Sequence, residues 1–154
     1  MPTRTFTCEL AVHAPVADVR EALAALAGDL SAHDRFLVSA EMVSEATAAD
    51  GTITRRYRVR DQYGGRRVGF GFDYDTQVTL SPTARTEYDT RLPFGIRLRT
   101  VVAAEPAPDG TIIRERVETT APRLLAGMVH HNVETAQAAI LHNLKARLEN
   151  QPPE

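Results

Sequence analysis

Alternation between apolar and polar residues, with a period of two, runs through residues 3–12 and again through 36–120 of the chain. In the segment 3–12, Phe6, Cys8, Leu10 and Val12 fall on one face, and mostly threonine and glutamate fall on the other. This period is typical of a β-strand with one buried face. Turns rich in glycine, proline or aspartate separate most of the segments. The sequence therefore predicts seven strands, over 3–12, 36–46, 52–62, 67–80, 84–92, 96–105 and 111–120.

Two segments carry the helical period of 3.6 residues instead. After Ala14 and Pro15, apolar residues recur at spacings of three and four up to Leu26, and a short helical turn is expected over 29–34. The segment 121–150 repeats this pattern over a much greater length, with an apolar stripe of Leu125, Val129, Val133, Ala136, Ile140 and Leu144. At about 1.5 Å per residue, this last helix is roughly 40 Å long. It is long enough to lie along a whole sheet.

The order of one strand, two short helices, six strands and a long helix predicts an α+β fold. Hairpin-length connections favour one antiparallel sheet, and only the long helix can cover most of one face. We therefore expect a seven-stranded curved antiparallel sheet wrapped around the C-terminal helix. The 154 residues suffice for one core. We expect a single ligand-binding domain over 1–150 and a disordered tail over 151–154.

Composition limits the classes of function. The net charge of −2 gives no bulk attraction to nucleic acid or to an anionic membrane. No stretch approaches the roughly 18 apolar residues of a spanning helix, so we expect no membrane insertion. Cys8 is the single cysteine, which indicates a reducing cytoplasm. The 17 arginines, one lysine and 22 alanines suggest a GC-rich bacterial source.

The inward face of the predicted sheet is unusually polar. Assigning each strand its more apolar face still places tyrosines, threonines, Arg55 and Glu115 inside. Buried polar groups without partners cost about 1–3 kcal/mol each, so a ligand cavity between sheet and helix explains the mixture. The alternative is that threonine and tyrosine are simply good strand formers whose hydroxyls bond to nearby backbone.

Candidate site residues follow from this inward face. Glu115 is a candidate general acid or base, because burial raises the pKa of a carboxyl group. Arg55 and Tyr57 are candidates for polarising a carbonyl, although an ion pair between Arg55 and Glu115 is about equally expected. We expect ligand contacts from further inward residues of the sheet and long helix: Tyr74, Tyr88, Phe70, Phe72, Thr90, Thr100, Asn132, Val129 and Ala136. Asn143 is expected in the same helix stripe as Asn132.

Other chemistries have little support. Arginines alternate on the outward face of several strands, but carboxylates share that face and no aromatic residues interleave with them. Ion pairs on a solvated sheet are therefore expected, not nucleic-acid binding. His130 and Glu134 have a metal-ligand spacing, yet a third ligand is missing and His130 lies off the apolar stripe. We expect no metal and no cofactor, since the nucleotide-binding and esterase motifs are also missing.

The layout resembles the START and Bet v 1-like helix-grip superfamily (SRPBCC), which includes polyketide cyclases and aromatases. The resemblance rests on the segments 14–19 (APVADV) and 141–149 (LHNLKARLE) and on the order of elements between them. It implies a sheet curled around the C-terminal helix with a ligand cavity between them. It also implies either a cofactor-independent polyketide cyclase-type enzyme, which performs aldol cyclisation and dehydration, or a non-catalytic carrier of a lipid or other hydrophobic ligand. The expected partner is a hydrophobic small molecule, and the expected state is a monomer or homodimer.

Overall fold

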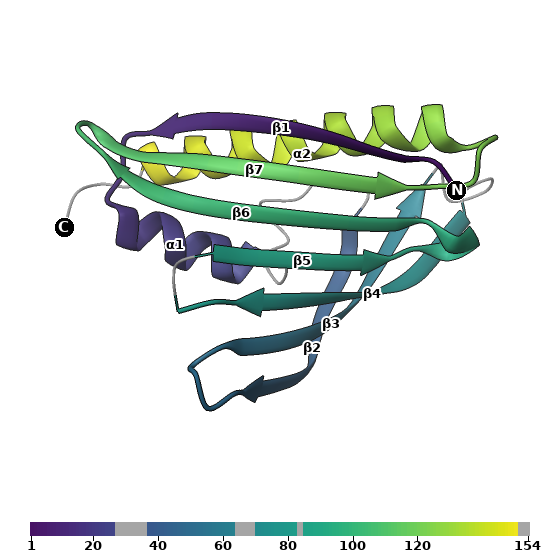
Figure 1. Cartoon of the computed structure of the whole chain (residues 1–154), viewed down its shortest axis with the longest axis horizontal. Coiled ribbons are helices and arrows are strands. Elements are labelled where there is room, and N and C mark those ends of the chain that lie inside the picture. The colour runs from purple at the N-terminus through teal and green to yellow at the C-terminus, as the bar shows by residue number, and fades with distance from the viewer. Residues whose placement is uncertain (27–36, 64–69, 83–84, 151–154) are drawn as a thin grey trace.

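The computed structural model describes residues 1–26, 37–63, 70–82 and 85–150. In this part of the chain, seven antiparallel strands form one sheet in the order β1-β7-β6-β5-β4-β3-β2 (Figure 1). Only β1 and β7 are joined out of sequence order. The strands are β1 (Thr3–Val12), β2 (Leu37–Thr47), β3 (Ile53–Tyr63), β4 (Phe70–Leu80), β5 (Arg85–Arg91), β6 (Arg97–Ala107) and β7 (Gly110–Thr120). A short 3-10 helix, η2 (Pro93–Gly95), connects β5 to β6.

Two α-helices pack on one face of this sheet, which we call the inner face. The long helix α2 (Ala126–Glu149) lies alongside β1 and β7, and the short helix α1 (Val16–Ala25) contacts β6, β7 and α2 (Figure 1). The main core joins Leu23 of α1 and Leu144 of α2 to Val102 and Ile113 of the sheet. Each such apolar side chain stabilises the fold by about 1.5–3 kcal/mol when it is fully buried. The long helix α2 is thus held mainly against the edge of the sheet that β1 and β7 form.

The predicted fold class is confirmed, with shifts at element boundaries. Each strand lies within three residues of its predicted limits, and the long helix begins at Ala126, five residues later than expected. One helix stands between β1 and β2 in the described residues. The short helical turn expected over 29–34 lies outside them.

A bulge in β2 changes which of its residues face inward. Met42 pairs with Tyr57, but the register then shifts, so that Glu45 lies opposite Arg55. Strict alternation from Met42 would send Glu45 outward, whereas the extra residue turns it to the inner face. This shift creates an ion pair that the alternation alone does not predict.

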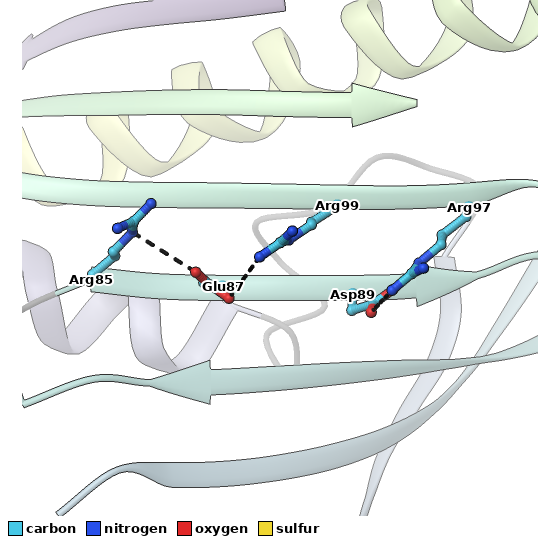
Figure 2. Close-up of polar contacts among 5 residues, drawn as sticks. All are labelled: Arg85, Glu87, Asp89, Arg97 and Arg99. Atoms are coloured by element: carbon cyan, nitrogen blue, oxygen red, sulfur yellow. Dashed lines mark hydrogen bonds and ion pairs between the residues drawn. The ribbon is translucent and has the colours of Figure 1, made fainter. Parts of the chain in front are cut away.

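The outer face carries cross-strand ion pairs instead of a free basic surface. Figure 2 shows Glu87 of β5 between Arg85 and Arg99, at 3.9 and 3.6 Å, and Asp89 paired with Arg97 at 2.6 Å. Further pairs follow the same face on the other strands: Arg58 with Asp75, Arg60 with Asp73, Arg114 with Glu9 and Glu105, and Arg116 with Glu118. Exposed pairs of this kind contribute little stability individually. They neutralise most of the arginines that a nucleic-acid surface would need.

Candidate functional site

Glu115 is a carboxyl group placed inside the main core. It lies on β7 between Cys8 of β1 and Val102 of β6, and only 4% of its surface is exposed. In the described part of the chain, the Cys8 thiol donates a weak hydrogen bond to this carboxyl group, with Sγ 3.9 Å from Oε1. Burial without a cationic partner raises the pKa of Glu115 to about 7. The group therefore exchanges a proton near neutral pH.

The neighbours of Glu115 are held in their neutral forms. Burial, with the charge of Glu115 as a second cause, raises the pKa of Cys8 to about 11, which makes this thiol a poor nucleophile. Burial also raises the pKa of Tyr88, and the nearby Glu115 adds to this shift. The Tyr88 hydroxyl donates to the backbone carbonyl of Leu23. Tyr88 therefore fastens α1 to the sheet, and its hydroxyl is already engaged.

Arg55 and Tyr57 form a second polar group on the inner face. Arg55 Nε donates to Glu45 Oε2 at 2.6 Å, and this bond is the main cause that raises the pKa of Arg55, to which Tyr57 also contributes. The predicted alternative pairing of Arg55 with Glu115 is wrong, because β2 supplies the partner. Four strand spacings separate β3 from β7, or about 19 Å along a flat sheet. Curvature of the sheet shortens this distance.

Two further candidate residues are hydrogen-bonded to neighbouring side chains of the sheet. The Tyr74 hydroxyl donates to the carboxylate of Asp61 at 3.3 Å, and Thr90 Oγ1 lies 3.0 Å from Thr76 Oγ1. Thr100 is buried in the row between Tyr88 and Val117. Val129 is buried against the sheet and Ala136 is half-buried. Phe70 and Phe72 belong to β4, and their side chains lie outside the described part.

The predicted inward placement of two asparagines is wrong. Asn132 and Asn143 are both exposed. Each residue advances an α-helix by about 100°, so Asn132 and Asn143 lie one such step from the buried Val133 and Leu144. The face of α2 that is buried against the sheet is therefore narrower than the sequence pattern predicts. The ligand contact expected of Asn132 stays a prediction, without the support of an inward-facing position.

Two buried polar side chains, one near the end of β7 and one near the start of α2, lack hydrogen bonds in the described structure. His130 is 6% exposed and Thr119 is fully buried, and neither the imidazole nitrogens nor Thr119 Oγ1 has a partner. Burial, and then the charge of Arg4, lower the pKa of His130. His130 was expected off the apolar stripe of the helix, and in the structure it is nevertheless buried. At 100° per residue it flanks the Val129–Val133 stripe on the side opposite to Asn132.

Two hollows of the described surface lie on the outer face. The larger, of about 630 Å³, has Val101 and Ala103 as its floor and Arg85, Arg114 and Arg116 around it. Cys8 and Glu115 also border this hollow. Because successive side chains of a strand point to opposite faces, the side chains of Cys8 and Glu115 point to the inner face. The smaller, of about 260 Å³, lies over the ion pairs of Figure 2. Both are open and walled by paired charges, so the chemistry of Glu115 belongs to the other side of the sheet.

The described residues show neither a cluster of metal ligands nor a helix that could cross a membrane. Within them, no three histidine, cysteine, aspartate or glutamate side chains lie close enough to hold a metal ion. None of the described helices has the length and apolar character needed to cross a bilayer.

Comparisons with known proteins identify the fold. No protein-family model matches the sequence, and no curated protein matches it. Among solved structures, the Zhui aromatase/cyclase from Streptomyces sp. R1128 is similar, with a TM-score of 0.75 and 16% identity over 96% of this chain and 94% of that one. Ara h 8.0201 gives a TM-score of 0.73 and 15% identity over 97% of this chain and all of that one.

A third similar structure is longer than this chain. The di-domain ARO/CYC BexL, from the BE-7585A biosynthetic pathway, has a TM-score of 0.72 and 16% identity. The match covers 97% of this chain but 51% of BexL, so this chain spans about half of BexL. At these identities the likenesses show the fold. The chain has a helix-grip fold, as these structures do, and the predicted resemblance is confirmed for the fold.

Proposed function

We propose that the protein binds a hydrophobic small molecule between the inner face of the sheet and α2, and that it catalyses aldol cyclisation and dehydration as a polyketide cyclase or aromatase-type enzyme. The observation that carries the proposal is Glu115, a carboxyl group with a pKa of about 7 and 4% exposure on that face. The structural likeness to Zhui and BexL, whose names describe such enzymes, supports it.

Glu115 has the proton-transfer properties that this reaction needs. In an aldol closure a base removes a proton from a carbon between two carbonyls, and the resulting carbanion attacks a further carbonyl carbon. The new alkoxide takes up this proton from the protonated base. In the dehydration the base removes the second proton of the same carbon, the freed electron pair forms the C=C bond, and the hydroxyl group leaves as water with that proton. A carboxyl group that is half ionised near neutral pH can accept the carbon-bound proton and return it to the departing hydroxyl.

Arg55 and Tyr57 act at a different part of the ligand. Three strands lie between them and Glu115 along the sheet, so we do not assign them to the carbonyl next to the proton that Glu115 removes. Instead they bind carbonyl oxygens further along an extended poly-ketone chain and fix its register. The Glu45 carboxylate holds the Arg55 guanidinium in place for this contact. The protein's own residues supply these roles without a cofactor.

Glu115→Gln tests the proposal, with Glu118→Gln as the matched control. Glu118 lies on the same strand but is paired with Arg116 on the outer face. With a poly-β-ketone thioester as substrate, we expect Glu115→Gln to lower kcat at least 100-fold while ligand affinity changes by less than about tenfold. Glu118→Gln should keep both values. Unchanged turnover in Glu115→Gln would refute the catalytic role, and an equal loss of binding and turnover would favour the carrier alternative.

A further inference from the structure

Large apolar side chains gather at one end of the molecule. Leu124 is 98% exposed, Phe94 82%, Met1 72% and Met128 59%. We call these four residues the apolar tip. Among the described residues, the other large apolar side chains with more than half of their surface exposed are Met42 and Val43 on β2. Single exposed apolar residues are ordinary, whereas a group of them indicates a contact surface.

The residues of the apolar tip come from three segments that touch one another. The Met1 Cε methyl group lies 3.2 Å from the position of a Cβ on Gly95, the residue next to Phe94. The carbonyl of Pro2 accepts a hydrogen bond from the Ala121 N–H at 3.3 Å, and this segment leads to Leu124. Met128 follows Leu124 by four residues, about one helical turn. Figure 1 shows the N-terminus, the β5–β6 connection and the start of α2 meeting at this end.

The backbone conformation of Phe94 is a second sign that its exposed ring belongs to a contact surface. Its φ of 65° lies in the left-handed region, which favours glycine or asparagine over a bulky side chain. In the described structure the ring gains little from packing in return. An apolar ring held in a costly conformation and presented to solvent is consistent with burial against another surface.

Charge at this end favours an anionic surface. Arg4 and Arg123 are exposed, and neither has an ion pair within the described part of the chain. The carboxylates of Asp89 and Glu118, by contrast, are paired with Arg97 and Arg116. The tip therefore combines protruding apolar groups with uncompensated positive charge.

We propose that the apolar tip docks the protein on an anionic lipid surface. Neither hollow of the outer face is lined by a residue of the tip, so the tip presents protruding side chains rather than a groove. Acyl chains accept protruding side chains without a preformed complementary hollow, while Arg4 and Arg123 lie beside lipid phosphates. The docking is peripheral and needs no spanning segment. It is independent of whether Glu115 performs catalysis.

Flotation of the full chain with vesicles tests this docking. We expect binding to phosphatidylcholine vesicles that contain about 30% phosphatidylglycerol, and at least tenfold weaker binding to pure phosphatidylcholine. The double variant Phe94→Ser with Leu124→Ser should bind the anionic vesicles at least tenfold more weakly. Met42→Ser with Val43→Ser removes two comparably exposed apolar groups from β2 and should leave binding unchanged. Arg123→Gln should weaken binding to the anionic vesicles only.

Three outcomes would overturn the proposal. The first is an absence of binding to the anionic vesicles, and the second is equal binding by the tip variant and the wild type. The third is a concentration-dependent dimer in sedimentation that the tip variant abolishes, since the tip would then be an interface between two copies. Because both substituted side chains are exposed, circular dichroism should show the tip variant to be folded. A loss of vesicle binding can then be assigned to the tip.

Discussion

The buried carboxyl group of Glu115 predicts an unusual pH dependence of stability. Its pKa is about 7 in the folded protein against an ordinary value of 4.5, so the folded state binds this proton more tightly than the unfolded chain. Each pH unit between the two values lowers the free energy of unfolding by about 1.4 kcal/mol. Across the whole interval, Glu115 therefore removes about 3 kcal/mol of stability.

The sign follows from the two protonation states. Below pH 4.5 the carboxyl is protonated in both the folded and the unfolded chain, and its contribution is fully present. Between pH 4.5 and about 7 the unfolded chain releases the proton first, which makes unfolding easier. Above this range both states are ionised and the loss is complete. Glu115→Gln carries a neutral amide at every pH and lacks this slope.

Urea denaturation followed by circular dichroism measures this difference. The free energy of unfolding of the wild type, minus that of Glu115→Gln, should fall by about 3 kcal/mol from pH 4 to pH 8. The subtraction cancels the opposite slopes of Asp89 and Glu149, whose pKa values are lowered mainly by hydrogen bonds from Arg97 and from the His13 backbone. Glu118→Gln, on the outer face of the same strand, serves as the control for the substitution itself. A flat line for Glu115→Gln would refute the desolvation argument.

Two matched pairs of variants test the packing on the sheet. Thr119→Val removes a buried hydroxyl without a partner and should stabilise the protein by about 1 kcal/mol in urea denaturation. Thr111→Val, on the same strand, removes a 2.8 Å hydrogen bond to the Ala14 carbonyl and should destabilise the protein by about 1 kcal/mol or more. A loss of stability in Thr119→Val would mean that its hydroxyl is bonded. Gly110→Ala places a Cβ 2.3 Å from a backbone oxygen at a φ of +143° and should lower the thermal midpoint sharply, while Gly127→Ala in α2 has open space and should raise it slightly.

Alternation in the sequence was sufficient to place the most important side chain. Glu115 lies inward because it shares a period of two with Ile113 and Val117, and a sheet with one covered face preserves that period. The partner of Arg55 was not predictable in this way. The β2 bulge that turns Glu45 inward depends on pairing with β3, and no residue type in the sequence marks it.

Contacts between distant elements account for the other differences. Spacing alone places Asn132 near the apolar stripe of the long helix, but the width of the buried stripe depends on how α2 lies against β1 and β7. Likewise, Tyr88 was expected to offer its hydroxyl to a ligand, whereas the C-terminal turn of α1 supplies a carbonyl acceptor at Leu23. These are tertiary contacts, and the hydrophobic periodicity and composition of the sequence do not predict them.

The central claim, that ligand binds on the inner face, can be measured by methyl chemical shifts. Val101 and Val102 are neighbours on β6 that face opposite sides of the sheet: Val102 belongs to the main core, and Val101 lines the outer hollow. On titration with a planar hydroxynaphthyl ketone, the methyl signals of Val102 and Leu144 should shift, and those of Val101 and Ala103 should not. Shifts confined to Val101 and Ala103 would place the ligand in the outer hollow and contradict the role given to Glu115.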